Sequence, residues 1–372
     1  MLLLAASGGR VAALLCLRAT AADAVRITGR GGGALRCRGA AIPRRRAIPM
    51  RPMPMLAAAS SSSSTSSTSP PAPSSPLDAV SSDQALAHPT LASLDQKALE
   101  RTTRYLDLVL KANSEGLNMT AVRSRGPALL RHCADSLDLL PLLDREEERW
   151  REEARNRAKN DGNDGPEKGS KVGFRVVDVG SGGGFPGAAL AAARPEWHFV
   201  LIDALRKRCD AVADAVKKAG IRNAEVLWSR AEEAAAVVAS PPPPPSDDDD
   251  DGKEGNSSSS SSSSSLRESS PVVVARAVAE MRTLAELCLP LVEVGGAWIS
   301  PKGPPGDNSQ LELEVEAARK AISLLGGEIE LIETLPPLIS GAPGRSVVVV
   351  RKVKGTPAKY PRGNNLPGRR PL

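Results

Sequence analysis

The chain has 372 residues, a formal net charge of +6 and only 2% aromatic residues. Its length allows two domains, but long stretches are too polar or too repetitive to bury a core. Five scattered cysteines without a Cys-x-x-Cys pair and three separate histidines argue against a disulfide framework, and we expect no metal site. The scarcity of aromatic side chains also argues against a surface that stacks single-stranded bases.

The first residues have the composition of a targeting segment. Residues 1–55 contain ten arginines, no lysine and one acid, Asp23, and a Ser/Thr/Pro tract follows at 60–76. An Arg-rich, Ser-rich and acid-poor start is typical of an organelle transit peptide, and the opening apolar run is too short to span a membrane. We predict a transit peptide and disordered linker over 1–76, and expect no membrane partner. The Ala- and Ser-rich length favours a chloroplast over a mitochondrion, and a plain disordered tail is the alternative.

Two further stretches have the composition of insertions. Residues 146–171 are charged and include the turn-forming run Asn-Asp-Gly-Asn-Asp-Gly. Residues 240–270 contain five consecutive prolines, five consecutive aspartates and nine consecutive serines. Neither composition buries enough apolar surface to offset its ordering entropy. We therefore predict a charged linker at 146–171 and a disordered surface loop at 240–270.

The remaining sequence predicts first helices and then an alternation of strands and helices. Apolar residues recur every three or four positions in 86–113 and 127–143, within an N-terminal helical region over 77–145. β-branched and apolar runs predict strands at 172–179, 198–202, 224–228, 271–275, 295–300, 328–333 and 346–352. Helices are predicted between them at 187–193, 205–219, 284–291 and 311–325.

This alternation indicates an α/β fold with a mostly parallel, Rossmann-like central sheet, over residues 172–355. No clear helix separates the last two predicted strands, so we expect an antiparallel pair at the end of the sheet. A basic tail, 356–372, follows the domain. The basic side chains near the C-terminus favour a phosphate-contacting arm, with a solvated tail as the alternative; they are Arg351, Lys352, Lys354, Lys359, Arg362, Arg369 and Arg370.

A glycine-rich turn follows the first predicted strand and carries the clearest chemical signal. It reads Asp178-x-Gly180-x-Gly182-x-Gly184, and it also contains a formal G-x-G-x-x-G match starting at Gly182. That dinucleotide pattern alone is weak evidence. An acid two residues before the first glycine suits a ligand with a cationic amino-acid end, such as S-adenosylmethionine, and would repel a pyrophosphate. We therefore expect Asp178, Gly180 and Gly182 to contact S-adenosylmethionine rather than a nicotinamide cofactor.

Two acids downstream extend this candidate site. Asp203 ends the second predicted strand, where a carboxylate can accept both hydroxyls of an adenosine ribose. A helix N-cap is the alternative role for this residue. Ala231 and Glu232 follow the third strand and could frame an adenine edge, although acids at the start of a helix are also favourable on their own.

Several short runs in this order resemble the bacterial small-subunit ribosomal RNA guanine-N7 methyltransferases, also called glucose-inhibited division protein B. The resemblance covers residues 100–372 apart from the two insertions. The runs are 117–122, 132–137, 178–187, 202–208, 230–232, 275–279, 287–291, 302–303 and 357–362. The tail departs from the usual Lys/Arg-Pro-Gly-x-Pro of the family at 363–367, so its contacts are not transferred.

The resemblance implies cofactor contacts at Gly180, Phe185, Ala231, Glu232 and Arg276. It implies S-adenosyl-L-methionine as the cofactor and small-subunit ribosomal RNA, or a ribosomal particle, as the partner. Arg276 follows the fourth strand and is expected to orient the cofactor or the guanine, with a structural ion pair as the alternative. Further candidates for RNA contact or for shaping the cleft are Asn118, His132, Asp135, Arg206, Lys207, Arg208 and Lys302.

The implied chemistry needs no catalytic base. Guanine N7 is an unprotonated acceptor whose lone pair can attack a sulfonium methyl directly. Positioning therefore suffices, and Arg276 is the one possible catalytic residue. Cys288 lies in a leucine-rich run and is expected in the core rather than as a nucleophile. The other readings are a small-molecule methyltransferase, an inactive ribosome-assembly factor with this fold and, least favoured, an NAD oxidoreductase.

Overall fold

The computed structural model describes residues 75–160, 173–236, 265–276, 278–302, 308–342 and 344–372. All of them belong to one compact unit, Ser69–Leu372. The predicted transit peptide and nearly all of its linker lie outside the described residues, as does most of the predicted insertion at 240–270. None of the described helices is long and apolar enough to span a membrane.

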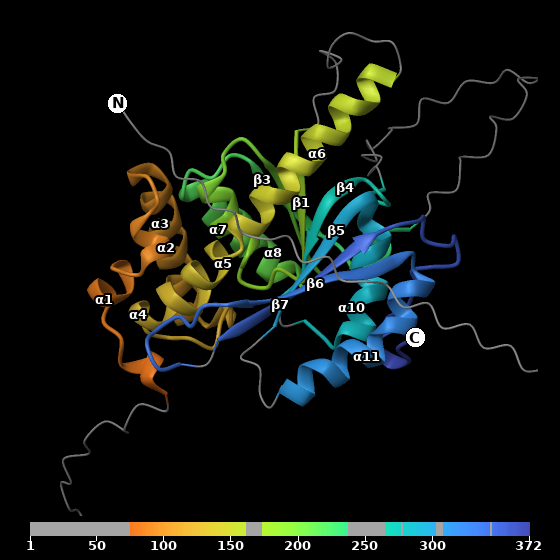
Figure 1. Cartoon of the computed structure of the whole chain (residues 1–372). Coiled ribbons are helices and arrows are strands. Elements are labelled where there is room, and N and C mark those ends of the chain that lie inside the picture. Colours follow the sequence, from red (N-terminus) through yellow and green to blue (C-terminus); the bar gives the residue numbers. More distant parts are fainter. Residues whose placement is uncertain (1–74, 161–172, 237–264, 277, 303–307, 343) are drawn as a thin grey trace, which may run out of the picture. The chain divides into compact units, whose positions relative to one another are not determined.

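A seven-stranded sheet with the order β3-β2-β1-β4-β5-β7-β6 forms the centre of the fold (Figure 1). The first five strands are parallel, whereas β7 runs antiparallel to both β5 and β6. The predicted α/β class and the antiparallel end pair are therefore confirmed. The strands are β1 (Arg175–Val179), β2 (His198–Asp203), β3 (Ala224–Trp228), β4 (Ser270–Val274), β5 (Val292–Lys302), β6 (Gly327–Leu335) and β7 (Arg345–Lys352).

Helices cover both faces of this sheet, and the strands have apolar side chains on both faces for that reason. Alternate residues of β1 show the division, since Val176 joins one buried cluster and Val177 the other. The first cluster includes α7 (Gly187–Ala193) and α8 (Arg206–Lys218). The second includes α9 (Ala231–Ala234), α10 (Met281–Cys288) and α11 (Asn308–Leu324).

The N-terminal helical region is more broken than the periodicity predicted. Residues 86–113 form the end of α1 (Ser82–Leu86), then α2 (Pro89–Ala92) and α3 (Gln96–Ala112). Pro89 starts a new helix, and the Asp95 carboxylate caps α3 by accepting from the amide of Ala98 at 2.9 Å. α3 packs on α7 and α8, which brings the N-terminal region against the sheet domain.

The second predicted helix, 127–143, is likewise divided. It comprises α4 (Arg125–Ala128), a π-helical turn η3 (Leu129–Ala134), α5 (Asp135–Leu137) and the start of α6 (Leu140–Asn160). The predicted apolar seam is nevertheless buried; it consists of Leu129, Leu130, Cys133, Leu137 and Leu140.

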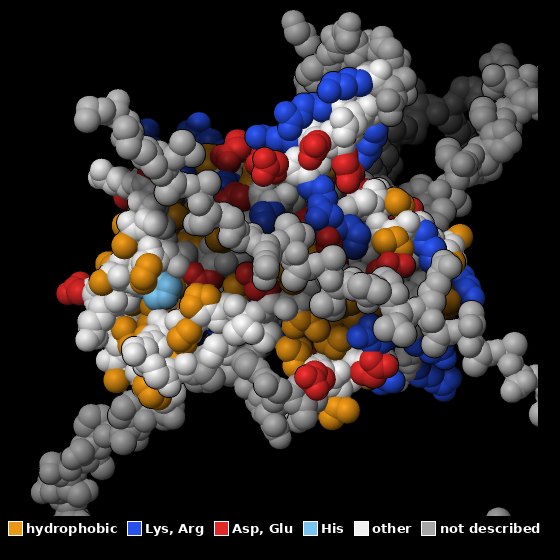
Figure 2. Space-filling view, in the orientation of Figure 1, with side chains coloured by type: hydrophobic (Ala, Val, Ile, Leu, Met, Phe, Trp, Pro, Cys, Tyr) orange, Lys and Arg blue, Asp and Glu red, His pale blue; other side chains and the backbone are white. Residues whose placement is uncertain are grey.

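The prediction of a charged linker from residue 146 is wrong for its first half, because α6 continues to Asn160. The helix packs on β4 and β5. Its buried acid Glu146 pairs with Arg351 of β7 at 2.7 Å, and Trp150 packs edge-on against Phe174. Basic and acidic side chains lie side by side on the surface in this region (Figure 2). The ion pair with β7 and the ring contact with Phe174 thus hold in place a segment whose charged composition predicted a linker.

The prediction of a disordered loop at 240–270 is wrong for its last residues, because 265–270 are ordered and hydrogen-bond to the chain before 237. The amide of Leu266 donates to the carbonyl of Ala234 at 2.9 Å, and the Ser265 hydroxyl donates to the carbonyl of Ala236 at 2.7 Å. The described residues on either side of 237–264 are therefore neighbours in space.

Candidate active site

The glycine-rich turn lies at the carboxyl end of β1 and bends toward β2. The amides of Gly180 and Ser181 both donate to the carbonyl of Ile202, at 2.8 and 3.0 Å. Gly180, Gly182 and Gly184 have φ values of +70, +58 and +83°, which L residues rarely adopt. The pattern of alternating glycines is thus a requirement of the backbone.

The three glycines differ in the room that the protein leaves where a Cβ atom would lie. A Cβ at Gly180 would lie 2.6 Å from Val278, and one at Gly184 would lie 1.8 Å from the Tyr105 hydroxyl. A Cβ at Gly182 would meet nothing closer than the carbonyl oxygen of Gly180, at 3.9 Å. Gly182 therefore faces open space, and the other two glycines face the protein.

Buried side chains of the N-terminal helices pack against this turn. The Tyr105 hydroxyl of α3 donates to the carbonyl of Gly183 at 2.9 Å. The ring of Phe185 stacks on His132, with centroids 5.0 Å apart, and meets Tyr105 edge-on. Phe185, which the family resemblance implied as a cofactor contact, is nearly fully buried in this arrangement.

Asp178 lies beneath the turn and is buried. Its Oδ2 accepts from the amide of Gly187 at 2.9 Å, which fixes the start of α7. Its Oδ1 is a buried acceptor without a hydrogen-bond partner in the described part of the chain. Burial raises the pKa of this carboxyl from its ordinary value of 3.8 to about 7. Oδ1 is therefore an acceptor that a cationic or hydrogen-bonding ligand group would satisfy.

Asp203 joins the end of β2 to the tip of the turn. Its Oδ2 accepts from the amide of Gly182 at 3.0 Å, and its Oδ1 accepts from the amide of Leu205 at 2.8 Å. The alternative role as a helix cap does not apply, because Leu205 occupies the N-cap of α8. Each carboxylate oxygen retains capacity for a further hydrogen bond.

Ala231 and Glu232 are buried at the start of α9. An unexpected neighbour reaches them, since the amide of Asn365 in the C-terminal tail donates to Glu232 Oε1 at 3.2 Å. The sequence predicted no contact between the tail and Glu232.

Arg276 is held in an ion-pair network. Its Nη1 lies 2.5 Å from Asp135 Oδ2 and also donates to Ser136 Oγ at 3.3 Å. Asp135 in turn pairs with Arg345, which also pairs with Asp138. Arg276 therefore forms the structural ion pair that was the alternative to a cofactor contact. Through Asp135, this network joins the residues that follow β4 to α5 and to β7.

The remaining candidates differ in how far their side chains are buried and paired. His132 lies at the turn, where its Nε2 is 2.6 Å from Thr120 Oγ1 and burial, with nearby Arg276, lowers its pKa to about 4. Asn118 is exposed in a left-handed conformation, and Lys302 pairs with Glu314 at 2.7 Å. The basic run at the start of α8 is mostly exposed; it comprises Arg206, Lys207 and Arg208.

Sequence reasoning missed the residues whose partners are distant along the chain. Tyr105, Arg345 and Asn365 contact the site from 78, 210 and 133 positions away. Tyr105 was recognised only as part of a helical seam. The exposed ring of Trp228, with the Arg206 guanidinium 4.8 Å from its centroid, was also not anticipated.

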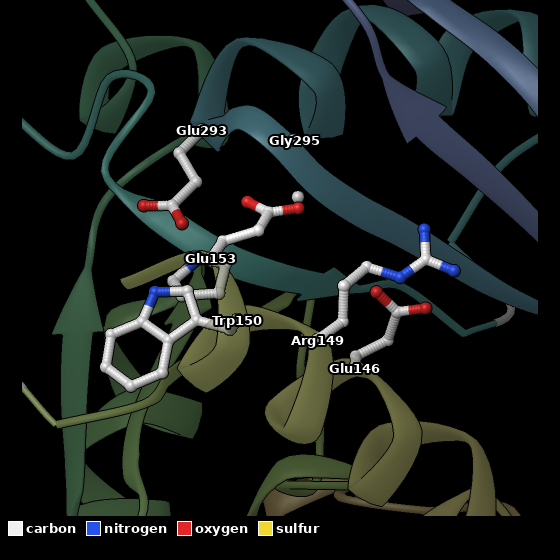
Figure 3. A pocket seen from close by; sticks show the side chains of 8 residues that line it. Glu146, Arg149, Trp150, Glu153, Glu293 and Gly295 are labelled. Atoms are coloured by element: carbon white, nitrogen blue, oxygen red, sulfur yellow. The ribbon is translucent and has the colours of Figure 1, made fainter. Parts of the chain in front are cut away.

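A small hollow lies away from the glycine turn, near the amino end of β4 (Figure 3). Glu146, Arg149, Trp150 and Glu153 of α6 line it, together with Glu293. Burial raises the pKa of Glu293. Among the described residues no cluster of His, Cys, Asp or Glu could hold a metal ion, so this hollow carries no metal assignment.

Comparison with known proteins identifies the relatives of this chain. The model of the family described as GidB, rRNA small subunit methyltransferase G, matches residues 167–241. The ribosomal RNA small subunit methyltransferase G of Pelotomaculum thermopropionicum is 32% identical, covering 75% of this chain and 92% of that protein. The protein of the same name in Symbiobacterium thermophilum is 32% identical, covering 78% of this chain and 98% of that protein. The one in Roseiflexus sp. is 33% identical, covering 75% of this chain and 94% of that protein. Among solved structures, the antibiotic-resistance methyltransferase Kmr is 16% identical, with a TM-score of 0.34 over 49% of this chain and 88% of that one; so distant a likeness carries no argument.

A Rossmann-like sheet with this glycine turn after β1 and an acid after β2 defines an S-adenosylmethionine-dependent methyltransferase. The relatives match over nearly their whole length. The chain belongs to the ribosomal RNA small subunit methyltransferase G family. The residues present fit the methyl donor, S-adenosyl-L-methionine, because Gly182 faces open space beside Asp203 and Asp178 has an unpartnered oxygen.

Proposed function

We propose that this protein methylates guanine N7 in the small-subunit, 16S-type ribosomal RNA of an organelle, in particular a chloroplast. The observation that carries the reaction type is the arrangement around Gly182. Open space there adjoins Asp203, which is expected to bind the ribose, and Asp178 near the end of β1 has a buried, unpartnered Oδ1 expected to bind the cationic end of the donor. The names of the relatives support small-subunit ribosomal RNA as the substrate.

The proposed reaction requires positioning rather than proton transfer. S-adenosylmethionine supplies an electrophilic methyl group when bound, and the guanine N7 lone pair forms the new bond while the carbon–sulfur bond breaks. The positive charge moves from sulfur to the base, and no proton is removed. The turn and Asp203 hold the donor, and Asp135 offsets the charge of Arg276 at 2.5 Å. Arg276 therefore orients a partner without strongly repelling the cationic product.

Exposed basic side chains beside the site support an RNA partner. Arg206 and Lys207 start α8, three and four residues after Asp203, and Arg230 precedes α9; all three are exposed. Trp228 ends β3 with 54% of its surface exposed and offers a single ring beside the Arg206 guanidinium. Such cations contact phosphates in a salt-dependent manner. We expect RNA binding by the full chain to weaken as salt rises.

A cofactor-site variant tests the proposal with little damage to the fold. Gly182→Asp places a carboxylate in open space, at a left-handed position that aspartate tolerates. Gly220→Asp is the matched control, because Gly220 has φ +75° and nothing within 4 Å of a Cβ. The protein is incubated with labelled S-adenosylmethionine and unmodified small ribosomal subunits, and the labelled atom is mapped.

We expect wild type and Gly220→Asp to label guanine N7, and Gly182→Asp to lose both labelling and donor binding. Label at another atom would refute the guanine-N7 proposal. Absence of donor binding by the wild-type protein would favour the assembly-factor alternative.

The organelle is tested separately. The composition of residues 1–55, with ten arginines and one acid, supports import. A reporter fused to residues 1–76 should enter isolated chloroplasts and be processed there. Import into mitochondria alone, or into neither organelle, would refute the chloroplast address and would leave the proposed reaction untouched.

A further inference from the structure

The C-terminal segment, residues 356–372, is anchored to the domain rather than extended as a free arm. Glu286 of α10 is fully buried and receives a paired contact from Arg362, with Nε at 2.8 Å from Oε1 and Nη2 at 2.6 Å from Oε2. The Arg362 backbone amide donates to the same carboxylate at 2.8 Å. The expected phosphate contact is therefore wrong for Arg362, whose charge is already paired.

A second arginine connects this segment to α9. Arg267 Nη1 donates to the carbonyl of Tyr360 at 2.7 Å and to that of Ala235 at 3.3 Å, and its Nη2 donates to the carbonyl of Thr356 at 2.7 Å. Ala235 directly follows the last residue of α9. One guanidinium thus ties the end of α9 to the start of the C-terminal segment.

The start of α9 receives the other contact. Asn364 and Asn365 have φ values of +56 and +55°, a left-handed turn that asparagine adopts more readily than other side chains. This turn directs the Asn365 amide to Glu232 Oε1 at 3.2 Å. Beyond the turn, Thr283 Oγ1 donates to the carbonyl of Pro367 at 3.4 Å.

Within the described part of the chain, the Asn365 amide is the hydrogen-bond donor that reaches the Glu232 carboxylate; the nearest side-chain cation, on Arg230, is 3.8 Å away. Glu232 is only 7% exposed, so its orientation depends on that amide more than on water. α9 is therefore tied to the C-terminal segment directly at its start, through Asn365, and indirectly at its end, through Arg267.

We infer that the C-terminal segment is a positioning element of the methyl-donor site and that Asn365 sets the orientation of Glu232. This inference rests on the proposed methyl transfer and on the donor contact that the family resemblance implies for Glu232. The segment acts through Glu232, so Asn365 is a positioning residue. Its role is distinct from RNA contact by the exposed cations Lys359, Arg369 and Arg370.

Two substitutions at one position test the inference in the full chain. Asn365→Val disfavours the left-handed turn and so displaces the amide, whereas Asn365→Gly preserves both the turn and the amide. We expect Asn365→Val to weaken S-adenosylmethionine binding about five- to tenfold, the fold-change of one net hydrogen bond. Its KM for the donor should rise with kcat retained at saturating donor, and Asn365→Gly should match wild type.

A pair of shortened chains provides a second route if Asn365→Val alters folding. A chain ending at Gly363 keeps the Arg362–Glu286 pair but loses the Asn365 amide. A chain ending at Gly368 keeps that amide and loses Arg369 and Arg370. The first should bind the donor weakly, and the second should bind it as wild type does, whatever its affinity for RNA.

Equal donor affinity in Asn365→Val, in the chain ending at Gly363 and in wild type would overturn the inference. Glu232→Gln separates this failure from failure of the proposed site. If Glu232→Gln binds the donor normally, the proposed role of Glu232 is wrong and the inference fails with it. If Glu232→Gln weakens binding and Asn365→Val does not, only the C-terminal role is wrong. Adding Asn365→Val to Glu232→Gln should produce little further weakening.

Discussion

The hydroxyl of Tyr105 donates a hydrogen bond to the carbonyl oxygen of Gly183 at 2.9 Å, deep inside the protein. Tyr105 belongs to α3, and Gly183 belongs to the turn that follows β1. The N-terminal helices are thus part of the donor site, because they determine where its glycines lie.

Removal of this hydroxyl should destabilise the protein. Tyr105→Phe leaves the carbonyl of Gly183 without its partner in a buried place, which costs about 1–3 kcal/mol. Tyr360→Phe is the control, because the described structure gives the Tyr360 hydroxyl no hydrogen bond. Urea unfolding measures both free energies. Equal losses in the two variants would contradict the assigned role of Tyr105.

The turn should reject a methyl group at Gly184. Gly184→Ala would place a Cβ 1.8 Å from the Tyr105 hydroxyl, in addition to backbone strain at φ +83°. Gly220→Ala carries comparable backbone strain, at φ +75°, with nothing within 4 Å. We expect Gly220→Ala to cost about 1–2 kcal/mol and Gly184→Ala about 1–3 kcal/mol more. Thermal unfolding with matched buffers compares them, and similar losses would refute the close approach of α3.

The network around Asp135 should contribute more than a surface ion pair. Asp135→Asn removes the charge between Arg276 and Arg345, whose side chains are 16% and 8% exposed. We expect a loss of about 3 kcal/mol in unfolding free energy. Asp107→Asn, in an exposed pair with Arg125, should cost less than about 1 kcal/mol. If denaturant unfolding gives Asp135→Asn the smaller loss, the network does not hold the N-terminal region.

Asp178 should make stability depend on pH. Its folded pKa, about 7, exceeds the ordinary value of 3.8, so between these values the folded state retains a proton that the unfolded state has lost. Stability from this group is therefore lost as pH rises through that window, at about 1.4 kcal/mol per pH unit. Asp178→Asn cannot titrate, and it should lose less stability than wild type between pH 4 and 7.

The comparison of wild type with Asp178→Asn removes the opposing pH dependence of stability that His132 contributes. The pKa of His132 is lowered to about 4, mainly by burial, so this histidine increases stability as pH rises toward its ordinary value of 6.5. Both proteins retain His132, and its contribution cancels in the difference between their unfolding curves. Parallel curves for wild type and Asp178→Asn would show that Asp178 is ionised in the folded state.

Local patterns made the sheet predictable. The helix at 187–193 and the strand at 224–228 have the predicted bounds to the residue, because each lies between clear turn signals. The glycine turn after β1, and the places of Asp178 and Asp203 near the ends of β1 and β2, were also predicted, since the sequence marks both strands clearly. These features depend on residues near one another along the chain.

Distant partners explain what the sequence did not reveal. The helix from residue 146 depends on the pairing of Glu146 with Arg351, 205 positions away, and its charged composition hid that partner. Asn365 reaches Glu232 only because the last residues fold back over α10. No periodicity or composition signals such a contact, since it depends on where the completed domain places the two segments.

The joined ends of residues 237–264 have a consequence for the history and the handling of this protein. Because the carbonyls of Ala234 and Ala236 accept hydrogen bonds from Leu266 and Ser265, the free-energy cost of closing the chain between them grows only slowly with its length. We therefore expect longer or shorter repeats of proline, aspartate and serine there to leave α9 and β4 in place. The same junction offers a place to splice in a fluorescent or affinity module while the donor site keeps its shape.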